Sequence, residues 1–559
     1  MNFLKFFIAF AGGWWRSSER WKAATLTAAL VSLTAMQVAI AVALNFWNLR
    51  LFDALEQRAM DRFLALIGAF SLILAANIGV TVAHLQIKRR LQVSWRRWMT
   101  RQMLRGWMGG GRHYMVSFAP GRQDNPDARI AEDIRVATEY AVDIGHSGLY
   151  STILLVSFIN ILWSISGTVP LSGIGLDGDL PGYLVWTALI YTVVGAWIAL
   201  RLGRPLTRAA NRRQASEADF RFSMARARSH GLAIALMRGE GDERRRFTRL
   251  FHRVVRAWDG QTKALRQFFY YLSSWPLVSQ IFPILLAAPR YIAGTISLGV
   301  LMQSAQAFGQ VVAALSWPID NLAKAAEWRA SAQRVGQLDE ALNSLRQPGK
   351  AGRITLTQAR TRELGFRHLA LTDAAGTPVT GHLDLTLHPG ERMMLTGDDA
   401  ALGPLFHAIA GLWPWGSGRI MVPPSDEIRL MPEQPYIPQG ILHDALCYPD
   451  SREAHGLVAI IGALDRAGLA RLSDHLEENA AWEDTLSFGD QQRLAFARLM
   501  LQSPAWIVLY NAATGLDSAQ ERDMMDLIDA SCPRAGVLII GHRPALEDRM
   551  TRIVAVNGP

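Results

Sequence analysis

Cysteine is scarce in this chain, which has only Cys447 and Cys532 among its 559 residues. Their number excludes a disulfide framework, and their spacing matches no zinc site, so we expect two reduced packing cysteines. No metal site is expected. The chain is too long for one ordinary domain, and its hydrophobic residues crowd into the first 330 positions. A membrane region followed by a soluble region is the simplest division.

Acidic residues are missing from one of two strongly basic stretches. Residues 88–112 contain eight Lys and Arg and no acid, whereas residues 201–256 contain fifteen Arg and five acids. Both stretches follow hydrophobic segments of spanning length, as the positive-inside rule expects for cytoplasmic extensions. The positions of the basic stretches therefore account for the net charge of +10 by orientation in the lipid bilayer, and we expect no nucleic-acid partner.

Six hydrophobic segments are long enough to cross a bilayer core of about 30 Å. They lie near 23–45, 63–86, 146–166, 183–202, 267–289 and 294–316. The loop 167–182 has no Lys or Arg and is expected outside, which places both termini in the cytoplasm. We predict a permease domain over 23–340, preceded by an amphipathic interfacial helix over 1–22 with Trp14 and Trp15 at headgroup level.

Two motifs in this half carry acidic residues. In DNPDARIAEDI, residues 124–134, Asn125-Pro126 breaks the helix and Asp127 is expected to cap the next one. This motif is either a capped turn or a coupling contact with the soluble region. In SEADFR, residues 216–221, Glu217 is either part of a solvated ion-pairing face with Arg213 and Arg221 or a protonatable site on a transport path.

The second half contains a nucleotide-loop pattern without its chemistry. After a linker over 341–353, β-rich and helical runs alternate across 354–559, which predicts an α/β domain. A strand over Met393–Thr396 leads to Gly397, and an apolar helix is expected from Leu405. A working phosphate loop would carry Gly-Lys-Ser/Thr here. The positions where that loop would lie are instead Gly397, Asp398, Asp399, Leu402, Gly403 and Pro404.

Three further motifs resemble an ABC-type nucleotide-binding domain. TLSFGDQQRLAFARLML, residues 485–501, resembles the ABC signature and its helix; TGLDSAQE and LIIGHRP resemble the loop after Walker B and the switch-histidine region. The resemblance implies that the signature acts at a helix N-terminus on ATP held by the opposite subunit. The residues implied to contact that nucleotide are Ser487, Phe488, Gly489, Asp490 and Asp517, with His542 as the switch histidine.

The same domain departs from the family at every catalytic position. Leu402 or Gly403 stands where the family has Lys, Tyr510 where it has the magnesium-ordering Asp, and Asn511 where it has the catalytic Glu. Glu433 replaces the usual Gln. Phosphoryl transfer depends on positioning and charge neutralisation by these groups. We therefore expect no catalytic residue and no ATP hydrolysis at the chain's own site; ATP is expected only at a composite site with a competent partner.

The membrane half resembles the SbmA/BacA-like branch, close to the peroxisomal-type ABC half-transporters. NFWNLRLFDAL, DNPDARIAEDI, SEADFR and GLWPWGSG carry this resemblance. It implies an α-helical six-span membrane domain (ABC exporter-like, type IV) followed by an α/β ABC domain, acting as a dimer in the bacterial inner membrane. It also implies import of peptides or other hydrophilic compounds, and marks Glu217 and Asp53 as acidic transport candidates.

Three functions stay open at this point. The first is a proton-driven importer with a vestigial ABC domain. The second is the silent half of a heterodimer whose signature completes a partner's ATP site, which would explain why the signature survives while the phosphate loop does not. The third is a structural or regulatory membrane protein that no longer transports.

Overall fold

A computed structural model describes residues 12–118, 125–170, 179–345, 354–358, 363–373, 375–556 and 558. The chain forms two compact units. Unit 1 comprises residues 1–104 and 125–338, and unit 2 comprises residues 105–124 and 339–559. Most of the expected linker and the middle of the loop 167–182 lie outside the described residues; residues 341–344, expected in the linker, continue a helix instead.

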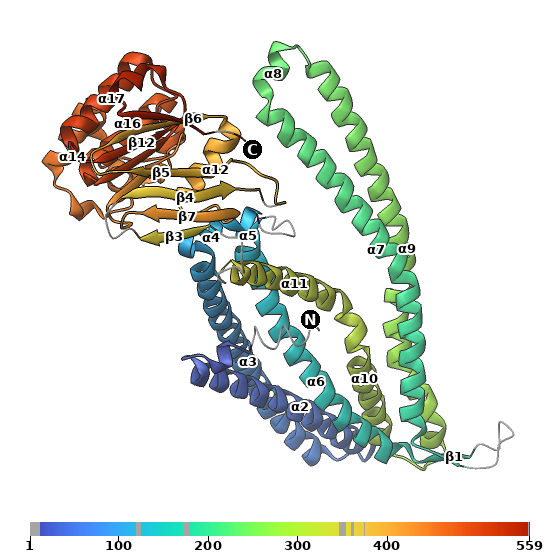
Figure 1. Ribbon diagram of the computed structural model, residues 1–559. Coiled ribbons are helices and arrows are strands. Elements are labelled where there is room, and N and C mark those ends of the chain that lie inside the picture. The colour runs from blue at the N-terminus through green and yellow to red at the C-terminus, as the bar shows by residue number, and fades with distance from the viewer. Residues whose placement is uncertain are drawn as a thin grey trace. The chain divides into compact units, whose positions relative to one another are not determined.

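Unit 1 is built from long helices, six of which are long and apolar enough to cross a membrane (Figure 1). They confirm the six predicted spans. The long helices are α2 (Arg20–Glu56), α3 (Met60–Met108), α6 (Ile134–Ser166), α7 (Tyr183–Ser229), α9 (Glu240–Ile292), α10 (Leu298–Asp320) and α11 (Leu322–Ser344). A short antiparallel hairpin, β1 (Thr168–Pro170) and β2 (Asp179–Pro181), joins α6 to α7.

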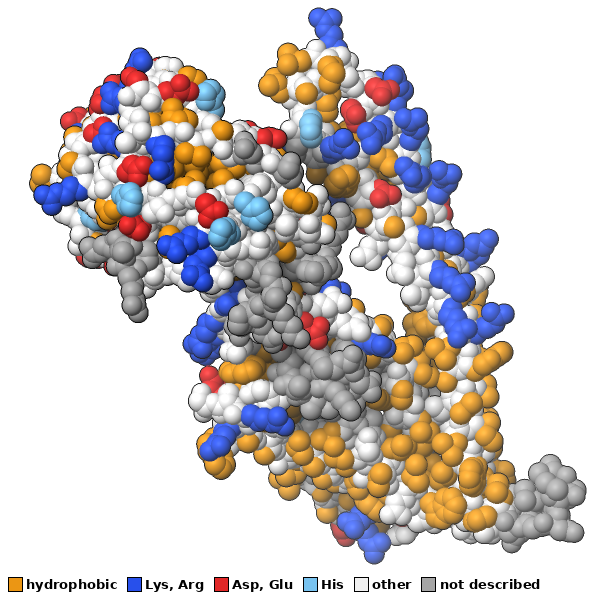
Figure 2. All heavy atoms as spheres, viewed as in Figure 1, with side chains coloured by type: hydrophobic (Ala, Val, Ile, Leu, Met, Phe, Trp, Pro, Cys, Tyr) orange, Lys and Arg blue, Asp and Glu red, His pale blue; other side chains and the backbone are white. Residues whose placement is uncertain are grey.

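The core of unit 1 lies where α2, α6, α7 and α10 meet. Phe158, Leu162, Ala188 and Phe308 are each 0% exposed there. Away from this core, α7 and α9 pair along their lengths and are joined by the short helix α8 (Gly231–Leu236). Figure 2 shows hydrophobic side chains over the lower part of this pair and Lys and Arg along its upper part. This division matches a helix pair that leaves a bilayer for water.

Acidic side chains at the end of α2 cap the start of α10. The Gly299 N–H donates to Asp53 Oδ1 at 3.1 Å, and the Leu298 N–H donates to Glu56 Oε2 at 3.0 Å. The Ser297 hydroxyl accepts the Val300 N–H at 3.2 Å. Carboxylates at a helix N-terminus satisfy free N–H groups and complement its dipole. Asp53 therefore helps to cap α10, a structural role that was not expected of it as a transport candidate.

Replacing Gly299 by Ala is expected to destabilise unit 1. A Cβ at Gly299 would overlap the Leu49 carbonyl oxygen and the Asp53 carboxylate, so α2 and α10 would have to separate. Overpacking of this kind costs about 1–3 kcal/mol. Gly309 on the same helix is a matched control, because a Cβ there meets nothing within 4 Å. Thermal unfolding of both variants in detergent measures the difference; equal midpoints would contradict this packing.

Two local expectations differ from the structure. Residues 1–11 of the helix expected over 1–22 lie outside the described residues, and the rest contains only a 3-10 turn, Trp14–Arg16, before α2 begins at Arg20. Trp14 is 0% exposed, with its ring 5.1 Å from that of Trp15, so it packs inside the protein rather than facing headgroups. Asp127 does not cap a helix either. Asn125, with a left-handed backbone, is the N-cap of α5 (Pro126–Ala128), which leaves Asp127 in the first turn.

Unit 2 contains two main sheets and a two-stranded antiparallel pair, β9 (Gly440–Ile441) with β10 (Asn479–Ala480). The larger has five parallel strands in the order β13-β6-β12-β11-β8, and the smaller has the order β3-β7-β4-β5. The strands are β3 (Thr355–Gln358), β4 (Leu364–Leu371), β5 (Leu383–Leu387), β6 (Arg392–Gly397), β7 (Gly416–Val422), β8 (Ile428–Met431), β11 (Trp506–Tyr510), β12 (Gly536–Ile540) and β13 (Arg552–Val556). The helices are α12 (Asp399–Ile409), α13 (Leu442–Cys447), α14 (Leu457–Arg466), α15 (Trp482–Thr485), α16 (Phe488–Gln502) and α17 (Ser518–Ser531).

The parallel sheet is covered on both faces, which explains its nearly continuous hydrophobic strands. On β6, Met393 and Leu395 pack in one core with α12 and the smaller sheet, whereas Met394 packs in the other with α16 and α17. Cys447 and Cys532 are buried and free, as predicted. The α/β fold of this region is therefore confirmed.

Candidate nucleotide site

The carboxyl ends of β6, β11 and β12 meet at one edge of the parallel sheet, where ligands of open α/β sheets bind. At this edge β6 ends at Gly397 and α12 begins at Asp399, so a single residue, Asp398, joins them. The helix was expected from Leu405, and that expectation was wrong. Asp398 caps this helix, and Ala400, Ala401 and Leu402 are good helix formers, so the residues that would form a phosphate loop are themselves helical.

The N-terminus of α12 already has an anionic group. The Ala400 N–H donates to Asp398 Oδ1 at 3.2 Å, and Asp399 occupies the first turn. Both carboxylates are exposed. A helix N-terminus binds phosphate through free N–H groups and a positive dipole end. Here a carboxylate uses one of those groups, and its charge would repel a phosphate.

Apolar packing fills the space behind this helix start. Leu402 is 1% exposed, and Tyr510 stacks on Phe406 with ring centroids 5.2 Å apart. A Cβ at Gly403 would lie 3.2 Å from the Tyr510 hydroxyl oxygen, so a longer side chain there would have to displace that hydroxyl. Burial, with Asp399 and Glu433 nearby, raises the pKa of Tyr510. The site therefore keeps a neutral phenol where the family has a metal-ordering carboxylate.

The residues at the positions of the catalytic Glu and the Q-loop Gln form hydrogen bonds with other residues of the domain. Asn511 has a left-handed backbone, which Asn tolerates better than Glu, and its N–H donates to the Ile540 carbonyl oxygen at 3.2 Å. The Glu433 carbonyl oxygen accepts from Gln492 at 2.9 Å, and its carboxylate accepts the Thr514 hydroxyl at 3.4 Å. Among the described residues, no group of three or more His, Cys, Asp or Glu could hold a metal ion.

The signature, in contrast, keeps an ordered helix start. Ser487 is the N-cap of α16, as the resemblance implied, and its hydroxyl accepts the Asp490 N–H at 3.2 Å. Arg471 holds the Asp490 carboxylate at 2.7 Å. Gly489 allows the loop after β11 to approach, because a Cβ there would lie 2.9 Å from the Gly515 carbonyl oxygen. Ser487 and Phe488 are exposed, so this surface is accessible.

Asp517 and His542 have local partners. The Asp517 carboxylate caps α17 by accepting the N–H groups of Ala519 and Gln520, each at 2.9 Å. His542 follows β12, which ends at Ile540, and its Nδ1 lies 3.6 Å from Glu547 Oε1. The His542 side chain is 62% exposed. Asp517 is thus engaged in a capping box, and the nucleotide roles of Asp517 and His542 stay predictions.

A further element of unit 2 was not predicted from the sequence. The segment 111–118, from the first basic stretch, includes α4 (Arg112–Met115) and packs on the α/β domain. The Tyr114 hydroxyl lies 3.4 Å from His407 Nδ1, and the Phe118 ring lies 5.7 Å from that of Trp415. Aromatic residues in the segment and in the α/β domain could have indicated this contact. The basic charge of the preceding stretch indicated only a cytoplasmic extension. This contact joins α4 to α12 within unit 2.

The contact is expected to weaken as the pH falls. Burial lowers the pKa of His407 below 6.5, so the histidine is neutral when the segment is packed. Unpacked His407 takes up a proton first, so packing is strongest above about pH 6.5 and is lost progressively below it. The protection factors of the residue 112–118 amides, each taken relative to the intrinsic exchange rate at the same pH, should therefore fall as the pH is lowered. His407→Gln should remove this pH dependence; an unchanged response in that variant would contradict the assignment.

The transport candidates of unit 1 lie in different surroundings. Glu217 accepts from Trp258 Nε1 at 3.0 Å and lies 3.8 Å from Arg213, with its side chain 46% exposed. The Arg213 guanidinium also lies over the Trp258 ring at 4.5 Å. The ion pair with Arg213 is one that the solvated-face interpretation expected, whereas the described residues show no such pair with Arg221. Asn125 and Pro126 belong to unit 1, and their coupling role stays a prediction.

Comparison with known proteins agrees with this architecture. Residues 13–292 match the family described as ABC transporter transmembrane region 2. A Haemophilus influenzae relative named as an uncharacterized ABC transporter ATP-binding protein is 27% identical, covering 97% of this chain and 90% of the relative. The Escherichia coli protein named inner membrane ABC transporter ATP-binding protein YddA is 27% identical, covering 91% of this chain and 90% of that protein.

More distant relatives extend the similarity. The Arabidopsis thaliana protein named ABC transporter D family member 2, chloroplastic, is 26% identical and covers 99% of this chain and 86% of its own length. A solved structure titled as a bacterial Atm1-family ABC exporter with ATP bound superposes with a TM-score of 0.70 at 14% identity, covering 95% of this chain and 93% of that one. This likeness confirms the ABC exporter fold. The chain belongs to the ABC transporter family with transmembrane region 2, as a multi-pass membrane half-transporter.

Proposed function

We propose that this half-transporter is an SbmA/BacA-like importer of peptides or other hydrophilic compounds, driven by a proton gradient. The single-residue connection from β6 to α12 carries this proposal, since it leaves no loop to wrap a triphosphate. ATP hydrolysis at this site would also lack a lysine and a metal-ordering carboxylate. The driving force must then come from elsewhere.

Dimer formation is part of the proposal. The helix α8 at the tip of the α7–α9 pair exposes Leu232 at 77%, Leu236 at 76% and Met237 at 74%. Exposed apolar clusters of this kind mark interaction sites. A second copy of this chain would cover this tip. The protein would lie in the bacterial inner membrane with both termini in the cytoplasm.

Uptake of a labelled peptide into liposomes containing only the purified protein tests this proposal. An inward proton gradient without ATP is expected to drive uptake, and an uncoupler is expected to abolish it. Glu217→Gln should reduce uptake if that carboxylate takes part, whereas Asp219→Asn on the same helix is the matched control. Uptake that requires ATP, or folded dimers without gradient-driven uptake, would contradict the proposal.

A second function is favoured by the exposed signature. Ser487 is the N-cap of an accessible helix start, although the same chain lacks a phosphate loop of its own. The chain would then be the silent half of a heterodimer, with Ser487 completing a partner's ATP site. Co-expression with an intact ABC half-transporter tests this. The complex should hydrolyse ATP, and Ser487→Arg in this chain should lower that activity at least about 100-fold; unchanged activity would exclude this function.

A further inference from the structure

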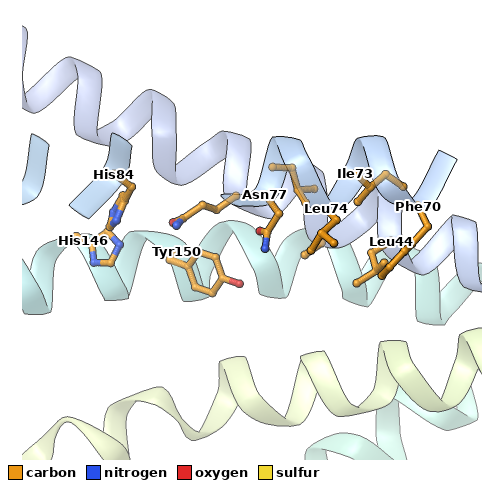
Figure 3. Close-up of a pocket in the computed structure, with 11 residues that line it drawn as sticks. Leu44, Phe70, Ile73, Leu74, Asn77, His84, His146 and Tyr150 are labelled. Carbon is orange, nitrogen blue, oxygen red and sulfur yellow. The ribbon is translucent and has the colours of Figure 1, made fainter. Parts of the chain in front are cut away.

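Two histidines face one another in a cavity of unit 1. His84 on α3 and His146 on α6 have ring centroids 4.3 Å apart, tilted by 41°. Both line a cavity of about 470 Å³ together with Gln37, Asn77 and Tyr150 (Figure 3). The opposite end of the cavity is lined by Leu44, Phe70, Ile73 and Leu74. The imidazoles therefore lie at the polar end of a partly apolar cavity.

His84 has a buried nitrogen without a partner. The residue is 7% exposed, and its Nε2 makes no hydrogen bond to any described residue. A buried polar atom is normally satisfied, so an unpaired one needs an explanation. A metal ion does not provide it, since the described part of the chain has no group of three suitable side chains. The unpaired nitrogen is therefore free to take up a proton.

Charged groups next to this pair join three helices. Asp143, one turn before His146 on α6, lies 3.4 Å from Lys88 on α3 and 2.9 Å from Lys324 on α11. Gln92 donates to the same carboxylate at 2.9 Å. The Lys324 ammonium also lies 5.1 Å from the centre of the Tyr140 ring. The Asp143 carboxylate thus forms ion pairs with two lysines, and a third positive charge nearby would compete with them for this carboxylate.

We propose that His84 and His146 form the proton-binding site of this transporter, with Asp143 as the group that responds. This deepens the proton-driven transport proposed above and rests on it. A proton entering the cavity from water adds to one ring nitrogen, and no covalent bond breaks. The pair takes one proton rather than two, since adjacent imidazolium ions would repel. A charged His146 then attracts Asp143 and weakens its bond to Lys324.

Release of Lys324 would loosen α11 from α6. Apart from this bond, Trp328 Nε1 donates to the Ala137 carbonyl oxygen at 3.1 Å, and Arg334 pairs with Asp133 through Nε at 2.7 Å. The Asp143–Lys324 bond is the one of the three that lies next to the cavity. Protonation at the cavity would therefore change the spacing of α6 and α11 at the Lys324 end.

The distance between spin labels on α6 and α11 tests this inference without transport. Labels at the exposed positions Thr152 on α6 and Ala326 on α11 are suitable, since the native cysteines are buried. In full-length protein in nanodiscs, the distance distribution is expected to shift between about pH 8 and about pH 4, a range that extends well below the usual histidine pKa because burial and Lys88 disfavour a charged imidazole. His84→Gln/His146→Gln should lose the shift. His230→Gln is the matched control, because His230 is exposed at the end of α7.

Lys324→Met provides a second, independent readout. Removing this lysine breaks the α6–α11 bond directly, so the distance distribution at about pH 8 should already match the acid form of the wild type. The proposal would be overturned if the wild-type distance distribution did not change with pH, or if the shift persisted in the double histidine variant. A shift that tracks the histidines in a protein without gradient-driven uptake would keep the proton site and contradict the transport proposal instead.

Discussion

Tyr510→Asp is expected to destabilise the α/β domain by about 3 kcal/mol without creating ATP hydrolysis. The change restores the residue type that the family has at this position. In this chain, however, the Tyr510 ring stacks on Phe406 and its hydroxyl lies over Gly403. A carboxylate there would lose the ring contact and would lie near the carboxylates of Asp399 and Glu433, whose influence on Tyr510 is already evident in its raised pKa.

Tyr510→Phe is the matched control. It keeps the stacked ring and removes only the hydroxyl, so a change below about 1 kcal/mol is expected. Denaturant unfolding of the full-length protein, followed by tryptophan fluorescence, measures both variants. ATP hydrolysis by the double variant Tyr510→Asp/Gly403→Lys would contradict the expected absence of hydrolysis. The helical start of α12 would then have to open into a phosphate loop.

Arg334→Met is expected to lower the stability of unit 1 by about 2 kcal/mol. Its guanidinium Nε donates to Asp133 Oδ2 at 2.7 Å, and the Asp133 side chain is only 11% exposed. Losing the partner of a buried carboxylate costs about 3–5 kcal/mol, but the Arg334 side chain is 46% exposed and solvent screens part of the pair. Thermal unfolding in detergent measures the loss.

Removing both charges should restore most of that stability. In Asp133→Leu/Arg334→Met no carboxylate is left unpaired, and apolar replacement of an ion pair is often neutral. The double variant should therefore unfold near the wild-type temperature. If it were as unstable as Arg334→Met alone, the cost would come from lost contacts of the arginine stem rather than from the unpaired carboxylate.

The sequence predicted the features that depend on composition and on local signals. Spanning length and apolar content located all six membrane helices, because a bilayer core imposes both. Ser487 was placed at a helix start by its motif, and α16 begins right after it. The α/β domain could be inferred because its β-rich runs alternate with helical ones.

Features that depend on contacts distant in sequence could not be predicted. The start of α12 was missed because residues 397–404 were taken as the position of a phosphate loop, whereas the Asp398 cap and the packing of Leu402 make this segment helical. The capping role of Asp53 requires Gly299, 246 residues later in the chain. His84 and His146 are likewise single residues on separate helices, and only the fold brings them together.

Titration of the purified chain with Mg-ATP tests most directly whether this chain has lost its own phosphate site. We predict no saturable binding up to about 1 mM, which corresponds to a binding free energy weaker than about −4.1 kcal/mol. An ABC half-transporter with an intact Gly-Lys-Ser/Thr loop serves as the positive control under the same conditions. Saturable binding of one nucleotide per chain at micromolar concentration would contradict the claim that Asp398 and α12 leave no phosphate site.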